Sequence, residues 1–105
     1  MSVPQPPPHD EGEIVPSALI DFIKSHSVSS TKSRELAIQL ITERDEFGFK
    51  KYGQHLRCAD QRDDIEDARQ EMGDLLQYIY KAKMNKCDLT EIKHLLEVLT
   101  ELISL

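Results

Sequence analysis

Apolar residues recur at intervals of three and four positions along most of this chain, a spacing that predicts amphipathic helices rather than strands. The first such run extends from Ser17 to Ile23. Because proline suits the first turn of a helix, we expect a short apolar helix to begin at Pro16 and to end at the serine cluster of residues 27–30.

A second helix is expected over about residues 32–49. Ser30 or Thr31 offers a side-chain oxygen that can cap its first amides. Gly53 accepts the backbone angles that a helix end requires, so the helix should break at Tyr52-Gly53.

Residues 53–61 show no apolar period and are expected to form a loop. The acidic residues that follow Arg62 complement the N-terminus of a helix, and the lysines at its other end complement a C-terminus. The longest helix is therefore predicted to begin near residues 62–64 and to end near Lys83 or Lys86.

A fourth helix is expected to follow Asp88-Leu-Thr-Glu91, which has the spacing of a capping box, and to extend to about Ser104. Its apolar positions cover an arc too broad for one neighbour in a small monomer, so self-association is expected. These positions are Leu89, Ile92, Leu95, Leu96, Val98, Leu99, Leu102 and Ile103. A chain of 105 residues can barely close its own core, so we predict an all-α, four-helix bundle completed by oligomerisation, as a homodimer or a tetramer built from dimers.

Residues 1–15 are rich in proline and polar groups and have no apolar face that would offset the entropy of ordering them. We expect a flexible tail there and a single domain over residues 16–105. No apolar stretch approaches the roughly 20 residues needed to span a bilayer, and the early prolines stand where a signal peptide would need its apolar segment. A cytoplasmic protein without a membrane partner is predicted.

The net charge of −6 argues against binding to nucleic acid, which depends on Lys and Arg that neutralise phosphates. A single nucleotide is not excluded, because a divalent cation can lie between an acidic site and a polyphosphate. Cys58 and Cys87 have no metal-type spacing and are expected to be free thiols, as in a cytosolic protein.

Glu43 projects from an apolar stripe on the second predicted helix, which is formed by Leu36, Leu40 and Phe47. A carboxylate on a core-facing stripe needs a cation, a proton or several donors, because an unpaired charge loses much of its hydration on burial. Glu46 lies one turn further on, close enough to share a cation with Glu43.

On the third predicted helix, Asp67, Glu71, Asp74 and Tyr78 form a stripe beside the apolar arc. That arc consists of Ile65, Ala68, Met72, Leu75, Leu76 and Ile79. Stacked carboxylates repel one another, and oxygen ligands of this kind suit a hard cation such as Mg²⁺, for which Mn²⁺ can substitute. A solvated acidic face with ordinary ion pairs is the alternative interpretation of both stripes.

The acidic pairs and the motifs around them occur in a defined order between residues 43 and 80. The pairs are Glu43-x-x-Glu46 and Glu71-x-x-Asp74, and the flanking motifs are Lys51-Tyr52-Gly53, Leu56, Arg62-Asp63, Asp67-Ala68 and Tyr78-Ile79. This order resembles that of the MazG-like all-α nucleoside triphosphate pyrophosphohydrolases, in particular their short phage and bacterial members. The chain departs from that pattern at Thr42, where the family often has glutamate, and in the loop Ala59-Asp60-Gln61 before Arg62-Asp63, where related short members often have Asn-Gly.

The resemblance implies a bundle of two or more subunits that binds Mg²⁺ through Glu43, Glu46, Glu71 and Asp74, near a subunit boundary. It also implies cleavage of a (d)NTP substrate between the α- and β-phosphates to give (d)NMP and pyrophosphate. Glu43 or Glu46 would then orient or deprotonate the attacking water.

Three further residues are candidates for substrate binding. Lys51 and Arg62 stand near the ends of the acid-bearing helices, where a cation can contact phosphate oxygens. Tyr78 could stack on a base or donate a hydrogen bond to a phosphate.

The main alternative function is a catalytically idle helical oligomerisation or regulatory module with the same fold. A phosphoribosyl-ATP pyrophosphohydrolase shares the bundle chemistry, but the motif order from Lys51 to Ile79 favours the MazG-like group. A nucleic-acid-binding bundle is disfavoured by the charge.

Overall fold

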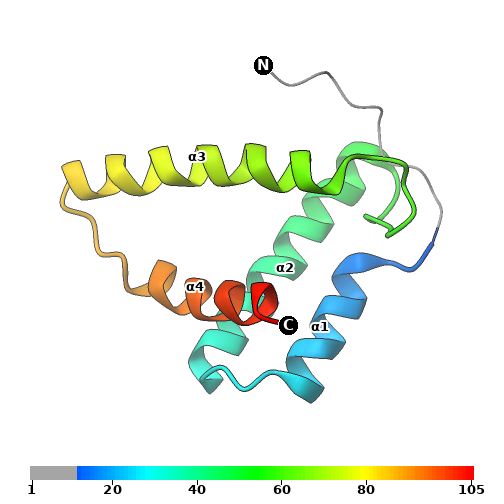
Figure 1. The fold of residues 1–105 in the computed structure, drawn as a ribbon, viewed down its shortest axis with the longest axis horizontal. Coiled ribbons are helices and arrows are strands. Elements are labelled where there is room, and N and C mark those ends of the chain that lie inside the picture. Colours follow the sequence, from blue (N-terminus) through cyan, green and yellow to red (C-terminus); the bar gives the residue numbers. More distant parts are fainter. Residues whose placement is uncertain (1–11) are drawn as a thin grey trace.

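The computed structural model describes residues 12–105, which form four α-helices and no strand (Figure 1). The helices are α1 (Val15–His26), α2 (Thr31–Tyr52), α3 (Asp64–Met84) and α4 (Thr90–Ile103). The all-α prediction is confirmed, with each expected helix present. No helix in this part of the chain is both long enough and apolar enough to cross a membrane.

The boundaries of α1 and α2 follow the local signals that predicted them. Proline stands in the first turn of α1. The Ser30 hydroxyl caps α2 by accepting a hydrogen bond from the amide of Ser33 at 3.2 Å. At the other end, Gly53 adopts a left-handed conformation with φ of 73°, and its N–H donates to the carbonyl of Phe49 at 2.8 Å.

The start of α4 differs from the prediction of a capping box. Asp88 accepts hydrogen bonds from the amide and the hydroxyl of Thr90, two residues on, and Leu89 occupies the cap position without a side-chain bond. A short Asp side chain reaches the second following amide readily, which forms a local turn in place of the longer capping contact. Glu91 makes no return bond, so the capping-box prediction was wrong.

The predicted tail lies largely outside the described residues, which begin at Gly12. Residues 13–15 already pair with the loop that follows α2. The amide of Val15 donates to the carbonyl of Leu56 at 2.7 Å, and that of Cys58 donates to the carbonyl of Glu13 at 2.9 Å. This isolated antiparallel bridge anchors the start of α1 beside the C-terminal end of α2.

The core is small and joins three of the four helices. Ile23 of α1, Ala37 of α2 and Val98 of α4 are buried, with exposures of 0%, 5% and 4%. Half-buried apolar side chains surround them: Leu19, Phe22, Ile38, Ile41, Leu95 and Leu102. Helices α1 and α4 thus both pack on α2, and the small Ala37 and Ser33 side chains allow this close approach.

The buried face of α2 is not the one that the apolar stripe predicted. Leu40 and Phe47 are 40% and 54% exposed, and Glu43 between them is exposed as well. At 100° per residue, this outer stripe lies roughly a third of a turn from the face centred on Ala37. The prediction of a core-facing Glu43 was therefore wrong for a single chain, because packing selected the smaller side chains on the neighbouring face.

Helix α3 stands apart from the rest of the described chain. Figure 1 shows it running alone across the molecule, and it packs against none of the other three helices. None of its residues is buried, and its apolar arc is open, with Ile65 78% and Leu76 64% exposed. A closed four-helix bundle is thus not formed within one chain.

Candidate functional site

The four predicted metal ligands all lie on solvent-exposed positions of α2 and α3. Glu43 and Glu46 project from the C-terminal half of α2, and Glu71 and Asp74 from the middle of α3. The Glu43 carboxylate accepts a hydrogen bond from the amide side chain of Gln39 at 3.2 Å. All four carboxylates are therefore accessible to a cation from solution.

A ligand set does not form within one chain. Among residues 12–105, no group of three or more His, Cys, Asp or Glu side chains lies close enough to hold a metal ion. The reason is the separation of α3 from α2, because the two pairs can meet only if these helices pack together. The residues of a single chain therefore do not fit a bound Mg²⁺ ion in this arrangement.

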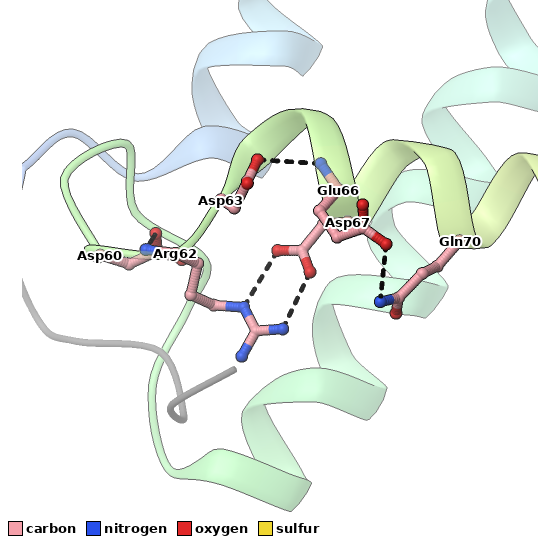
Figure 2. Close-up of polar contacts among 6 residues, drawn as sticks. All are labelled: Asp60, Arg62, Asp63, Glu66, Asp67 and Gln70. Carbon is pink, nitrogen blue, oxygen red and sulfur yellow. Dashed lines mark hydrogen bonds and ion pairs between the residues drawn. The ribbon is translucent and has the colours of Figure 1, made fainter. Parts of the chain in front are cut away.

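Arg62 and Asp67 form the best-defined polar contact near the predicted site (Figure 2). The guanidinium donates from Nε to one carboxylate oxygen at 3.0 Å and from Nη2 to the other at 2.9 Å. This hydrogen bonding lowers the pKa of Asp67 and raises that of Arg62, against a smaller opposing effect of desolvation. The predicted phosphate contact of Arg62 would have to coexist with this pair.

The surrounding bonds fix the loop that leads into α3. Asp63 caps the helix by accepting from the amide of Glu66 at 3.0 Å, and buried Asp60 accepts from the amide of Arg62 at 3.1 Å (Figure 2). Gln61 between them has a positive φ of 65°, a conformation that glycine adopts without strain. This left-handed residue lies in the loop Ala59-Asp60-Gln61, where the sequence departs from the pattern it otherwise resembles.

Lys51 and Tyr78, the other predicted substrate contacts, are exposed and lie on different helices. The ammonium of Lys51 lies 5.3 Å from the centre of the Tyr52 ring at the end of α2. Tyr78 is 67% exposed on α3. Like the acids, these two residues come from elements that do not pack together within one chain.

An apolar groove beside the C-terminal half of α2 was not predicted from the sequence. It has a volume of about 420 Å³ and is lined by α1, α2 and the following loop, with Leu19, Leu40, Phe49, Tyr52 and Leu56 among its side chains. Periodicity could not reveal it, because its walls come from three segments that only the fold brings together.

At one edge of this groove, the carboxylate of Asp45 and the imidazole ring of His55 are in hydrogen-bond contact. The carboxylate oxygen lies 2.7 Å from Nδ1 of the ring, whose centre is 4.7 Å from that of Phe49. The contact ties the loop after α2 back onto the helix. Asp45 and His55 are ten positions apart in the sequence, a separation that gave no periodic signal.

A second unpredicted feature is a polar network between α4 and the serine-rich connection from α1 to α2. Glu101 accepts from the amide of Val28 at 2.8 Å and Glu97 from that of Ser30 at 2.6 Å. The hydroxyl of Ser29 in this connection and that of Ser33 in the first turn of α2 add further bonds, and these donors lower the pKa of both carboxyl groups. The network is structural, since every bond joins two parts of the three-helix core.

Comparisons of this chain with protein-family models, with curated proteins and with solved structures find no match. The MazG-like resemblance therefore stays a prediction that depends on the motif order alone.

Proposed function

We propose that this protein is a Mg²⁺-dependent nucleoside triphosphate pyrophosphohydrolase that cleaves a (d)NTP between its α- and β-phosphates. The products would be the monophosphate and pyrophosphate. The observation that carries the proposal is the ordered pair of acidic motifs, Glu43-x-x-Glu46 and Glu71-x-x-Asp74, on the two longest helices.

The state of these carboxylates supports the proposal. All four are exposed, and among the described residues the side chains of Glu46, Glu71 and Asp74 have no hydrogen bond or ion pair that would occupy them. Carboxylate oxygens on accessible helix faces are the kind of ligand that Mg²⁺ prefers. Basic side chains at the helix ends, including Lys51, are available to contact phosphates.

The proposal requires the acid-bearing surfaces of α2 and α3 to face each other, and within one chain they do not. A homodimer, or a tetramer built from dimers, would supply this arrangement, and the open apolar faces of both helices support such an assembly. The site would then lie at a subunit boundary.

The function is tested by incubating the full chain with each dNTP and NTP in the presence of Mg²⁺ and measuring pyrophosphate and monophosphate. We expect release of both in equal amounts, with loss of activity on addition of a chelator. Glu71→Gln should lower turnover by more than about 100-fold, because ligand loss exceeds the 10- to 100-fold effect typical of residues behind the ligands. The matched control is Glu91→Gln, an exposed glutamate on α4 that should behave like the parent. Orthophosphate in place of pyrophosphate would mean that a different bond is cut.

A catalytically idle oligomerisation module is the second candidate. The absence of a three-residue ligand group within residues 12–105 favours it, together with the open face of α3. Under this alternative, no nucleotide in the panel is hydrolysed, and Glu71→Gln is indistinguishable from the parent in both mass and stability.

A further inference from the structure

The apolar groove beside the C-terminal half of α2 has the dimensions of a small-molecule site. Its volume of about 420 Å³ lies within the roughly 300–1,000 Å³ that such sites occupy, and its walls are mostly aliphatic and aromatic side chains. Leu40, Phe49 and Tyr52 in these walls are exposed, so the described residues leave them uncovered. The groove therefore offers room and apolar surface to a bound molecule.

The groove follows α2 over about three turns. Lining positions on this helix recur at intervals of four residues: Leu40, Arg44, Gly48 and Tyr52. At a rise of 1.5 Å per residue, the stretch from the first to the last of them extends about 18 Å along the helix axis. An extended molecule matches this length better than a single ring does.

Gly48 lines the groove, and packing within the described chain does not explain why a glycine stands there. The position lies inside α2, where glycine is less favourable than alanine. Apart from its neighbours in the helix, a Cβ atom at this position would meet no atom of the described residues within 4 Å. The missing side chain leaves open space in the groove and lets an occupant approach the backbone of α2 closely.

The charged side chains of the lining favour an anion. Arg44 forms no ion pair within residues 12–105, and its guanidinium lies 4.5 Å from the centre of the Phe47 ring. Asp45, the acid of the lining, is already in hydrogen-bond contact with His55. The charge that stays available at the groove is thus positive, although the chain as a whole has a net charge of −6.

We propose that this groove binds an unbranched aliphatic carboxylate, with the carboxylate group on Arg44 and the chain passing over Gly48 toward Tyr52. Burial of the chain against the apolar walls drives binding, and the guanidinium donates charge-assisted hydrogen bonds to the head group. The inference does not rest on the proposed hydrolysis, because no lining residue of the groove belongs to the predicted metal ligands or nucleotide contacts.

The ligand class is tested with decanoate, added to the full chain below its micelle-forming concentration and followed by isothermal titration calorimetry. We expect one decanoate per chain. Decyltrimethylammonium, which has the same chain length and a positive head group, should bind at least about two- to fivefold more weakly, the range that a partly exposed ion pair supplies. Arg44→Met keeps an apolar stem without the charge and should remove this preference. Equal affinities of the two probes for the parent would refute a carboxylate ligand.

The location is tested by filling the groove. The side chain introduced by Gly48→Leu enters the open space and should weaken decanoate binding by more than about tenfold, because it displaces two or more methylene groups of the probe from the walls. Gly73→Leu is the matched control, since it changes another helix-interior glycine with equally open surroundings, on α3 outside the groove. Circular dichroism checks that both variants keep their helices. Undiminished binding by Gly48→Leu, or an equal loss in Gly73→Leu, would overturn the proposal.

Two further measurements separate the groove from other surfaces. Amide chemical shifts should change on decanoate addition at the residues that line the groove, whereas changes confined to the open apolar arc of α3 would mean that the probe binds there instead and would end the proposal. A dNTP with Mg²⁺ should not displace decanoate, and displacement would assign the groove to the nucleotide rather than to a separate ligand. If decanoate binds as expected but no nucleotide is hydrolysed, the proposed function fails and the groove assignment stands.

Discussion

Ser33 is fully buried, and its hydroxyl lies between α2 and α4. Its oxygen is 2.8 Å from Nδ1 of His94 and donates to Glu97 at 3.0 Å, both on α4, while the Ser30 hydroxyl donates to it at 2.9 Å. Buried polar groups of this kind stabilise a fold only when all partners are satisfied. The position therefore specifies how α4 is seated on α2, and a methyl group could not replace it.

We expect Ser33→Ala to lower the free energy of unfolding by about 1–3 kcal/mol, because His94 and Glu97 lose the hydroxyl that they share between α2 and α4. Urea denaturation followed by circular dichroism measures the change. Ser104→Ala is the control, since its hydroxyl is exposed and donates only to the carbonyl of Thr100 in its own helix. Equal stabilities of the two variants would contradict the role assigned to Ser33.

Stability should also depend on the ionisation of Glu97 and Glu101. Hydrogen-bond donors lower the pKa of both carboxyl groups below the ordinary value of 4.5. The main cause is the Ser30 amide for Glu97 and the Ser27 hydroxyl for Glu101. Because the pKa values are lower in the folded state, the two carboxylates contribute fully to folding stability above pH 4.5. This stabilisation is lost as the pH falls through the lowered values.

The free energy of unfolding in urea should accordingly decrease as the pH is taken from about 5 to about 3. The double variant Glu97→Gln, Glu101→Gln retains acceptors but no titrating group, so its decrease should be shallower. Parallel profiles for the two proteins would show that other carboxylates, such as Asp67, govern the acid response.

At the scale of the elements, α3 differs from its neighbours in what stabilises it. Helices α1, α2 and α4 share buried side chains, whereas α3 has no packing partner among the described helices. Its helical state within a chain therefore depends on local terms: the Asp63 cap, the acidic first turn, and the lysines of its last turn. Each of these local interactions adds only a little stability, and no tertiary packing supports the helix. A single substitution at the start of α3 should therefore measurably change the stability of this helix.

Asp63→Ala should destabilise α3 by about 0.5–2 kcal/mol through loss of the bond to the Glu66 amide. We expect faster hydrogen exchange at the amides of the first turns of α3, with little change in α1, α2 or α4. Asp64→Ala serves as the comparison, because that residue lies in the same turn but is not the cap residue. Uniform acceleration across all four helices would instead indicate that α3 unfolds together with the core.

For the whole molecule, the limiting feature is the size of the core. Within residues 12–105 the buried core consists of Ile23, Ala37 and Val98, with Pro16 also buried at the start of α1, and large hydrophobic side chains on α2, α3 and α4 remain exposed. A single chain thus buries too little apolar surface to be very stable by itself. Association that covers α3 and the outer stripe of α2 would bury a second apolar layer. Folding stability and association are expected to be coupled.

The midpoint of thermal unfolding should consequently depend on protein concentration. An approximately 100-fold dilution of the parent should lower the Tm by on the order of 10 °C, because association stabilises only the folded state. The Tm of Leu76→Asp, which places a charge on the apolar arc of α3, should be lower and independent of concentration. The control Leu105→Asp places the same charge at an exposed leucine outside α3 and the outer stripe of α2, and its Tm should follow that of the parent. A concentration-independent Tm in the parent would argue against coupling.

The helices and most of their ends could be predicted from the sequence because the signals are local. A hydroxyl at Ser30, a glycine at Gly53 and the acids after Arg62 act on neighbouring amides and carbonyls, so their effect needs no distant residue. The one wrong prediction of a cap, at Asp88, also has a local cause, because this side chain accepts from the amide of Thr90 rather than from that of Glu91.

Which face of each helix is buried was decided only by the tertiary structure. On α2 the stripe of Leu40 and Phe47 and the face of Ser33 and Ala37 both follow a helical period, and periodicity alone cannot choose between them. Packing with α1 and α4 buries the face of α2 that has the smaller side chains, and the acidic residues of α2 and α3 remain apart. The candidate ligands could thus be identified along the sequence, whereas their spatial relation depends on how helices pack, which is a sum of contacts between residues distant in the chain.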